Sequence, residues 1–143
     1  MTAAREIMTP DPAYVRSSDS VREAVGKIAD RGIGSVPVIG EDNRVKGMIT
    51  DRDIVVRVLA EGKDPHAMHA SELIQGDGTV VTVSVDEDIA DLMRKMTTNR
   101  VRRLPVTDGD KLVGIVAQAD VAKAMDNPNA GELVDAISTD STG

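Results

Sequence analysis

The chain has 143 residues, a formal net charge of −7 and no cysteine. Without cysteine it can form no disulfide, thiolate metal site or cysteine nucleophile, and the cytoplasm is the expected compartment. The acidic charge disfavours nucleic acid and anionic lipid, and the single aromatic residue, Tyr14, is too little to stack on bases. No apolar stretch is long enough to span a bilayer, so we expect neither a nucleic-acid partner nor a membrane partner.

An internal repeat organises the sequence. The segments 36–55 and 104–122 follow the same pattern, with Pro37 matching Pro105 and Asp53 matching Asp120. Each half is too small to bury enough surface alone, so the repeats are expected to share one aliphatic core. We expect the core to include the following residues on paired strands: Val38, Ile49, Val106 and Val116.

Each repeat predicts the order strand, helix, strand, strand, helix, preceded by a short helical segment. Asp19 or Ser20 caps the first helix of repeat 1 and Gly32 ends it, while Gly62 ends the second. The elements predicted for repeat 1 are Ala4–Met8, a strand near Val15, a helix from Val21, strands Ser35–Ile39 and Val45–Ile49, and a helix over about Asp51–Ala60.

Repeat 2 predicts the same elements with a tight turn at Asp108-Gly109-Asp110. They are Ala70–Ile74, a strand near Val83, Asp88–Thr98, Arg102–Thr107, Lys111–Val116 and Gln118–Met125. The expected organisation is repeat 1 at 3–62, a connector at 63–69, repeat 2 at 70–126 and a tail at 127–143. In the tail, Gly131–Ile137 is expected to form a short helix before the end frays.

The two repeats resemble CBS domains, named after cystathionine β-synthase, over residues 3–126. The motifs that carry the resemblance are Ile7-Met8-Thr9, Ser20-Val21, Val36-Pro37-Val38, Gly47–Ile54, Val101–Val106 and Gly114–Val121. The chain is also similar to stand-alone bacterial two-repeat proteins of the hypoxic response type. The resemblance implies an α/β (α+β) fold of two pseudo-symmetric repeats packed through their sheets. It further implies clefts for adenosyl ligands such as AMP, ADP, ATP or S-adenosylmethionine, and association into a homodimer.

Thr50 and Asp53 are the leading candidates for binding ribose. They stand three residues apart where a strand becomes a helix, so a hydroxyl and a carboxylate face one point. A carboxylate can accept hydrogen bonds from both ribose hydroxyls, and the threonine oxygen adds a donor or an acceptor. The same spacing is close to a capping box, in which these side chains satisfy the helix's own N–H groups, and the sequence leaves both interpretations open.

Repeat 2 has Ala117 in place of the hydroxyl residue and keeps only Asp120. It also has Arg102 and Arg103, at positions where members of the resembled family often place basic residues that meet phosphates. If the clefts draw on both repeats, Thr50 and Asp53 would hold ribose while Arg102 lies near the phosphates. The alternative for the two arginines is a solvated strand end.

The adenine would need an apolar slot rather than aromatic stacking. The candidates by position are Ala13, Met48, Val81 and Ile115, each of which could equally serve plain sheet packing. His66 and His69 have the spacing of a helical metal site but lack a clear third ligand, so no metal site is expected.

The sequence therefore predicts a regulatory, ligand-sensing module of a signalling or stress-response system, with an adenosyl nucleotide as its ligand and no required cofactor. No P-loop, Rossmann glycine fingerprint or Ser-His-Asp pattern indicates an enzyme. The alternative is a ligand-free interaction or scaffold protein with degenerate clefts. The sequence does not name the regulated protein.

Overall fold

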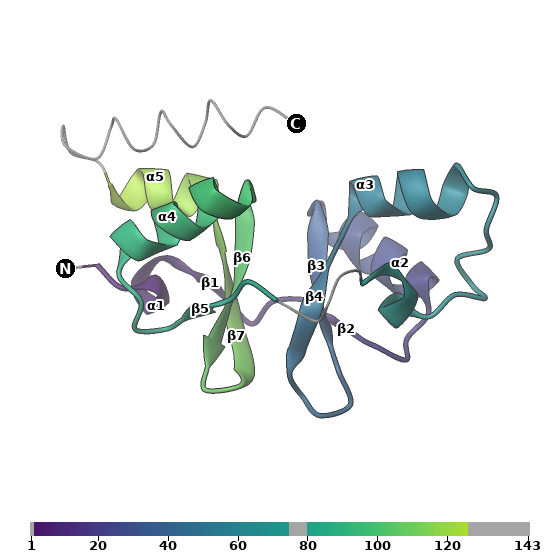
Figure 1. Cartoon of the computed structure of the whole chain (residues 1–143), viewed down its shortest axis with the longest axis horizontal. Helices are drawn as coiled ribbons and strands as arrows, with labels where there is room; N and C mark the ends of the chain where they lie inside the picture. Colours follow the sequence, from purple (N-terminus) through teal and green to yellow (C-terminus); the bar gives the residue numbers. More distant parts are fainter. Residues whose placement is uncertain (1, 75–79, 126–143) are drawn as a thin grey trace. The chain divides into compact units, whose positions relative to one another are not determined.

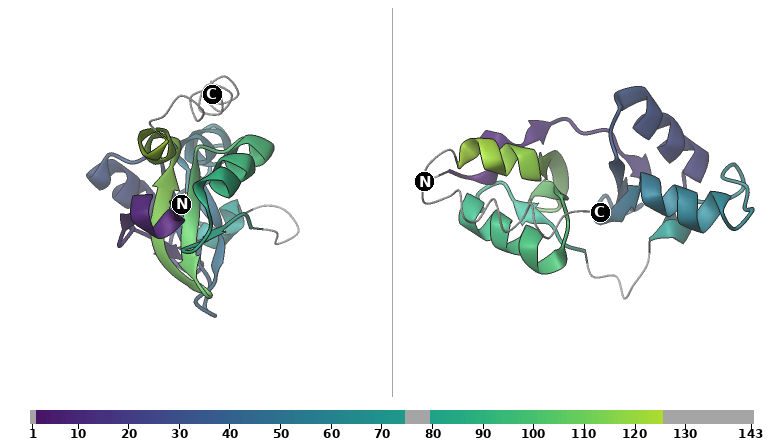
Figure 2. Two further views of the ribbon diagram at one scale, coloured as in Figure 1. Left: turned by 90° about the vertical axis from the view of Figure 1, so that its left-hand side faces the viewer. Right: turned by 90° about the horizontal axis from the view of Figure 1, so that it is seen from above.

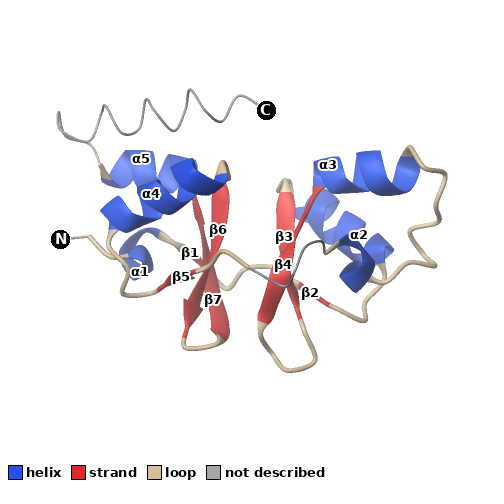
Figure 3. Cartoon of the chain, in the orientation of Figure 1, coloured by secondary structure: helices blue, strands red, loops and turns tan. Residues whose placement is uncertain are grey.

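The computed structural model describes residues 2–74 and 80–125. It divides into two compact units: unit 1 comprises Met1–Asp11 and Val81–Gly143, and unit 2 comprises Pro12–Val80. Figure 1 shows both units, and Figure 3 shows that each combines a small sheet with helices. Within the described ranges, no helix is long and apolar enough to cross a membrane.

Unit 2 is a three-stranded sheet with helices on one face (Figure 1). The strand order is β2-β3-β4, with β2 parallel to β3 and β3 antiparallel to β4. The elements are β2 (Val15–Arg16), α2 (Val21–Arg31), β3 (Ser35–Ile39), β4 (Val45–Thr50), α3 (Asp51–Ile54), the π-helix η1 (Val55–Leu59) and the 3₁₀-helix η2 (Ala70–Leu73).

Unit 1 repeats this plan with one more strand. Its order is β1-β7-β6-β5, in which β5 is parallel to β6 and both β6 and β1 are antiparallel to β7. The elements are α1 (Ala4–Ile7), β1 (Thr9–Pro10), β5 (Val83–Ser84), α4 (Ile89–Asn99), β6 (Arg103–Asp108), β7 (Lys111–Ala117) and α5 (Gln118–Ala124). Figure 2 shows α4 and α5 side by side in this unit.

The start and end predicted for the first long helix are confirmed, and α4 begins and ends within one residue of the predicted Asp88–Thr98. The Ser20 hydroxyl accepts a hydrogen bond from the Glu23 N–H at the start of α2, and Asp88 accepts one from the Ala90 N–H at the start of α4. Helix α2 ends at Gly32, whose φ of 61° lies in the left-handed region that glycine enters without steric cost. Helix α4 ends in the same conformation at Arg100, with a φ of 53°.

The single shared core predicted from chain length is wrong, because the buried side chains form two clusters, one in each unit. Val38 and Ile49 are fully buried in the cluster of unit 2, and Val106 and Val116 in that of unit 1. In each unit, alternate strand residues point toward the helices that cover one face of the sheet. Each sheet thereby encloses a core with its own helices.

Two short segments pack away from the repeat to which they belong in sequence. Helix α1 opens repeat 1, yet its Ala4 is fully buried in the core of unit 1, among repeat 2 residues. Conversely η2 opens repeat 2, but Ala70 and Leu73 are buried in the core of unit 2. The boundaries of the sequence repeats, 3–62 and 70–126, therefore differ from the boundaries of the compact units.

We call α1 and η2, each with the residues that directly follow it, the exchanged segments. They pack closely against the sheets at two glycines, Gly47 and Gly114. A Cβ on Gly47 would lie 3.0 Å from the Ile74 Cδ1 atom, and one on Gly114 would lie 3.0 Å from the Thr9 carbonyl oxygen and closer still to Met8. The side chain of Ile74 therefore packs closely against the backbone at Gly47. The added strand β1, which the sequence did not predict, pairs with β7 at this point.

The helix predicted over about Asp51–Ala60 is present, but its second half is wound as a π-helix. It continues from α3 into η1, where the Ala60 N–H donates to the Val55 carbonyl five residues earlier at 2.9 Å. The β-branched run Val55, Val56 and Val58 is unfavourable in a tightly wound α-helix. The helix predicted at Gly131–Ile137 lies outside the described residues.

Candidate functional site

Thr50 and Asp53 lie together where β4 passes directly into α3. The Thr50 hydroxyl oxygen accepts a hydrogen bond from the Asp53 N–H at 3.0 Å, and the Asp53 Oδ2 atom accepts one from the Thr50 N–H at 3.0 Å. Both residues are half-buried. The capping box that the sequence allowed is therefore formed, and it holds both side chains in fixed positions.

The capping box leaves hydrogen-bonding capacity on both side chains. The Thr50 hydroxyl accepts through its oxygen, so its proton remains available to donate. Asp53 uses Oδ2 for the cap, while its Oδ1 atom makes no hydrogen bond with residues in the described part of the chain. The cap therefore presents one donor and one charged acceptor side by side.

The beginning of β3 lies next to this box. Ser35 pairs with Thr50 across the antiparallel ladder, and the Asp51 N–H donates to the Gly34 carbonyl at 2.9 Å. Gly34 and Ser35 carry no charge. The β3 side of the box in unit 2 is thus small and neutral.

Unit 1 has the same backbone arrangement with different side chains. The Asp120 Oδ2 atom accepts a hydrogen bond from the Ala117 N–H at 2.8 Å, but Ala117 has no hydroxyl to return one. Arg103 pairs with Ala117, and the Gln118 N–H donates to the Arg102 carbonyl at 2.8 Å. The structure therefore places Arg102 and Arg103 beside the helix start that carries Asp120. The grouping of Arg102 with Thr50 and Asp53 stays a prediction.

Two of the four adenine candidates occupy equivalent positions in the sheets. Met48 lies opposite Pro37 and Ile115 lies opposite Pro105, and both candidates are half-buried. They alternate with Ile49 and Val116, whose side chains fill the cores, so they point to the other face of their sheets.

The other two adenine candidates have less specific surroundings. Val81 packs against the core of unit 1, in agreement with the packing alternative. Ala13 is half-buried just before β2. The neighbouring Tyr14 is 42% exposed, and the Arg16 guanidinium lies 5.7 Å from its ring centre.

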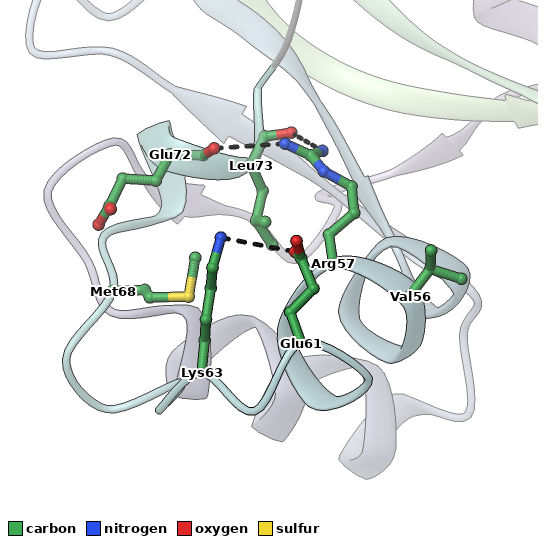
Figure 4. Close-up of a pocket in the computed structure, with 7 residues that line it drawn as sticks. All are labelled: Val56, Arg57, Glu61, Lys63, Met68, Glu72 and Leu73. Atoms are coloured by element: carbon green, nitrogen blue, oxygen red, sulfur yellow. Dashed lines mark hydrogen bonds and ion pairs between the residues drawn. The ribbon is translucent and has the colours of Figure 1, made fainter.

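A polar cavity in unit 2 was not found from the sequence. It has a volume of about 400 Å³, and Figure 4 shows the Arg57 guanidinium pointing to the main chain of η2. Arg57 donates to the Leu73 carbonyl at 2.6 Å, which fastens η2 to the unit. Val56, Arg57, Glu61, Lys63, Met68, Glu72 and Leu73 line the cavity. They come from η1, η2 and the intervening segment, so no short motif could have identified them.

His66 and His69 are engaged in the local structure of the segment before η2. The His69 ring Nδ1 atom lies 3.0 Å from the Ser18 carbonyl oxygen. The backbone N–H of His69 donates to the Glu72 carboxylate at 2.6 Å. The His66 N–H donates to the Asp64 carboxylate at 2.9 Å. Among residues 2–74 and 80–125, no three histidine or carboxylate side chains gather in a metal-binding group.

Comparison with known proteins agrees with this geometry. The CBS domain family model matches residues 4–60 and 77–127, one match for each sequence repeat. Hypoxic response protein 1 of Mycobacterium tuberculosis is 36% identical over 137 residues, which cover 96% of this chain and 94% of that protein. The match therefore extends over nearly the full length of both chains.

Solved structures show the same fold. That of Hypoxic Response Protein I, described with two coordinated zinc ions, has a TM-score of 0.79 at 36% identity and covers 87% of this chain and 99% of that one. The hexameric CBS-CP12 protein from bloom-forming cyanobacteria has a TM-score of 0.74 at 29% identity, covering 89% and 75%. CBSX2 in complex with AMP has a TM-score of 0.71 at 22% identity, covering 87% and 96%. With two matching domains, the repeat pattern and the two-sheet architecture, this chain belongs to the CBS domain family.

Proposed function

We propose that the chain is a cytoplasmic regulatory module that binds an adenosyl nucleotide and acts through binding rather than through catalysis. The observation that carries the proposal is the capping box at Thr50 and Asp53, which holds a hydroxyl and a carboxylate in place with unused capacity on both. A ligand binds more tightly when the protein groups that it contacts are already held in place, because no conformational entropy is lost in ordering them.

A ribose fits this pair by its hydrogen-bonding chemistry. The vicinal hydroxyls of ribose can donate to the Asp53 carboxylate, and one of their oxygens can accept the Thr50 proton. Hydrogen bonds to a charged acceptor are worth about 1.5–3 kcal/mol each before the cost of ordering the ligand. Capping and ribose binding are compatible, because the first uses Oδ2 and the second needs only Oδ1 and the free proton.

The remaining parts of a nucleotide find suitable side chains in the same elements. Asp120 offers a second, weaker ribose contact, and Arg102 and Arg103 next to it suit phosphate. For the adenine we propose apolar contacts from Met48, Ile115, Ala13 and Val81. CBSX2, which shares the fold, has been solved with AMP, so this fold can hold an adenine nucleotide.

The proposed output of ligand binding is a change in the state of a partner protein. We propose a homodimer as the working form. The CBS-CP12 protein is hexameric, which supports self-association as a property of this fold.

Calorimetric titration with AMP, ADP, ATP and S-adenosylmethionine tests the proposal. Asp53→Asn keeps an oxygen that can accept the Thr50 N–H but loses the charge, so it should weaken binding about three- to tenfold while the fold persists. The matched control is Asp120→Asn, which should have the smaller effect because that site already lacks a hydroxyl. Equal affinities for the wild type and Asp53→Asn would contradict the ribose assignment.

A second function, a ligand-free scaffold, is favoured by one observation. The capping roles of Thr50, Asp53 and Asp120 explain why those residues stand where they do without any ligand. The scaffold alternative predicts that none of the four nucleotides raises the melting temperature. A ligand that binds the native state at 100 times its Kd should raise stability by about 2.7 kcal/mol, so the difference is readily measured.

A further inference from the structure

The polar cavity between η1 and η2, which we call the η1–η2 cavity, has the size of a binding site for a small molecule. Its volume of about 400 Å³ lies within the range of about 300–1,000 Å³ that is usual for ligand pockets. One wall is the π-helix η1, and π-helical turns are rare and frequently lie at functional sites. The cavity belongs wholly to unit 2, and Thr50 and Asp53 are not among the residues that line it.

The arginine in this cavity is not required to hold a short helix on its unit. In unit 1 the equivalent short helix, α1, packs on α5. There Ala124 stands four positions after Asp120, just as Arg57 stands four positions after Asp53. The fold therefore accepts an alanine at this place, and the guanidinium group of Arg57 can serve a further purpose.

The positive charge of Arg57 has no carboxylate partner among residues 2–74 and 80–125. Its guanidinium group donates to two carbonyl oxygens, that of Leu73 at 2.6 Å and that of Glu72 at 3.4 Å. The Glu72 carboxylate accepts from the backbone N–H of His69 at 2.6 Å and points away from Arg57 in Figure 4. Arginine has five N–H donors, so some of them remain for a ligand. A carboxylate on the ligand would neutralise this charge.

The other two charged groups of the cavity form a weak ion pair. The Lys63 Nζ atom lies 3.5 Å from the Glu61 Oε2 atom, and the two side chains are 51% and 52% exposed. Figure 4 shows them pointing toward one another inside the ring of lining residues. A long, exposed ion pair contributes little to stability and is easily rearranged. A ligand with both a carboxylate and an ammonium group could replace this one pair with two.

The rest of the lining includes apolar side chains. Val56 and Met68 line the cavity, and Met68 is half-buried there. Methionine is flexible and polarizable, so it adapts to apolar groups of different shapes. An apolar group beside a carboxylate and an ammonium group describes one class of small molecule.

We propose that the η1–η2 cavity binds a free α-amino acid with an apolar side chain. Its carboxylate lies between Arg57 and Lys63, its ammonium group pairs with Glu61, and its side chain packs against Val56 and Met68. This site is separate from the proposed nucleotide site and uses none of the residues assigned to it.

Calorimetric titration with L-leucine and two analogues tests the proposal. 4-Methylpentanoate is L-leucine without its ammonium group, and 3-methylbutylamine is L-leucine without its carboxylate. L-leucine should bind most tightly, because only it makes both ion pairs. Saturating AMP should leave its affinity unchanged, because AMP is expected at Thr50 and Asp53.

Two variants assign the charged groups of the ligand. Lys63→Met should bind L-leucine about three- to tenfold more weakly and bind 3-methylbutylamine as the wild type does. Glu61→Gln should weaken L-leucine similarly and leave 4-methylpentanoate unchanged. The matched control is Lys46→Met, which removes another exposed lysine of unit 2 from an ion pair, that with Asp42, and should bind as the wild type does. Thermal melting checks that each variant folds.

The outcomes distinguish this inference from the proposed function. If the wild type does not bind L-leucine, or if Lys63→Met binds it as tightly as Lys46→Met does, the inference is overturned. If 4-methylpentanoate or 3-methylbutylamine binds as tightly as L-leucine, the amino-acid assignment is overturned. If L-leucine binds with the expected losses while no nucleotide binds, the η1–η2 cavity stands and the nucleotide site fails.

Discussion

Thr50 and Ala117 hold the same place in the two units, and comparing them separates what the fold needs from what a ligand could use. Each directly precedes a helix whose third residue, Asp53 or Asp120, accepts a hydrogen bond from the backbone N–H of Thr50 or Ala117. Only Thr50 returns the hydrogen bond. The helix of unit 1 forms without that second bond, so the carboxylate alone is enough to start it.

The units also differ in how the chain builds them. Unit 2 is a continuous stretch, Pro12–Val80, whereas unit 1 joins Met1–Asp11 to the chain from Val81 onward. The two cores are of similar composition, but one of them depends on a segment far away in the sequence. Four experiments test what these features contribute to the fold.

The largest effect is expected from cutting the chain. A fragment of residues 12–80 contains every element of unit 2 and should fold cooperatively, because its core is complete. A fragment of residues 1–62 follows the sequence repeat but lacks Ala70 and Leu73, which are buried in that core, and should remain unfolded. Circular dichroism during thermal melting distinguishes the two. A cooperative melt of 1–62 would mean that the exchanged segments are dispensable.

Adding a methyl group at Gly114 should lower stability more than adding one at Gly47. Gly114→Ala places a Cβ 3.0 Å from the backbone oxygen of Thr9, which cannot move without shifting β1, and should destabilise by about 1–3 kcal/mol. Gly47→Ala meets only the Ile74 side chain, which can adjust, and should cost about half as much or less. Urea denaturation of both variants measures the difference. Equal losses would show that η2 is held as rigidly as β1.

The helix cap at Ala117 lacks a hydroxyl, and substitutions at Ala117 and Thr50 measure what that hydroxyl contributes. Thr50→Ala should lower stability by about 1 kcal/mol through loss of the hydroxyl that accepts from the Asp53 N–H. The reverse change, Ala117→Thr, should raise stability by about 0.5–1 kcal/mol by giving Asp120 the same partner. Chemical denaturation checks both. No gain from Ala117→Thr would indicate that the neighbourhood of unit 1 prevents the hydroxyl from reaching the N–H group.

The smallest effect is expected in the hairpin between β3 and β4. The hydrogen bond from the Lys46 ammonium, with the Arg44 N–H, lowers the pKa of Asp42 below its ordinary value of 3.8. A lowered pKa means that the ionised form stabilises the fold above pH 3.8, and that this contribution is lost as the pH falls through the native pKa. Asp42→Asn should therefore reduce stability slightly at pH 6 and not at pH 2. An identical loss at both values would assign the effect to the turn rather than to the charge.

Much of the local structure could be predicted from the sequence because its causes are local. Ser20 and Asp88 cap helices through their own side chains, and the repeat showed that both halves have the same plan. The proximity of Thr50 to Asp53 also followed from spacing, because residues three apart on a helix turn face one side. Which role the pair fulfils did not follow, since capping and ribose binding call for the same two residue types at the same spacing.

The repeat, the limits of the first long helix, three strands in each repeat and the family could all be read from the sequence. The packing of α1 and η2 with the other repeat, the separate core of each unit and the hydrogen bond that holds η2 to Arg57 became visible in the folded chain. It also showed that Arg100 occupies a left-handed position that Gly32 occupies in the other unit. The physical reason is that burial is non-directional: apolar periodicity shows which face is covered, but not which segment of the chain covers it.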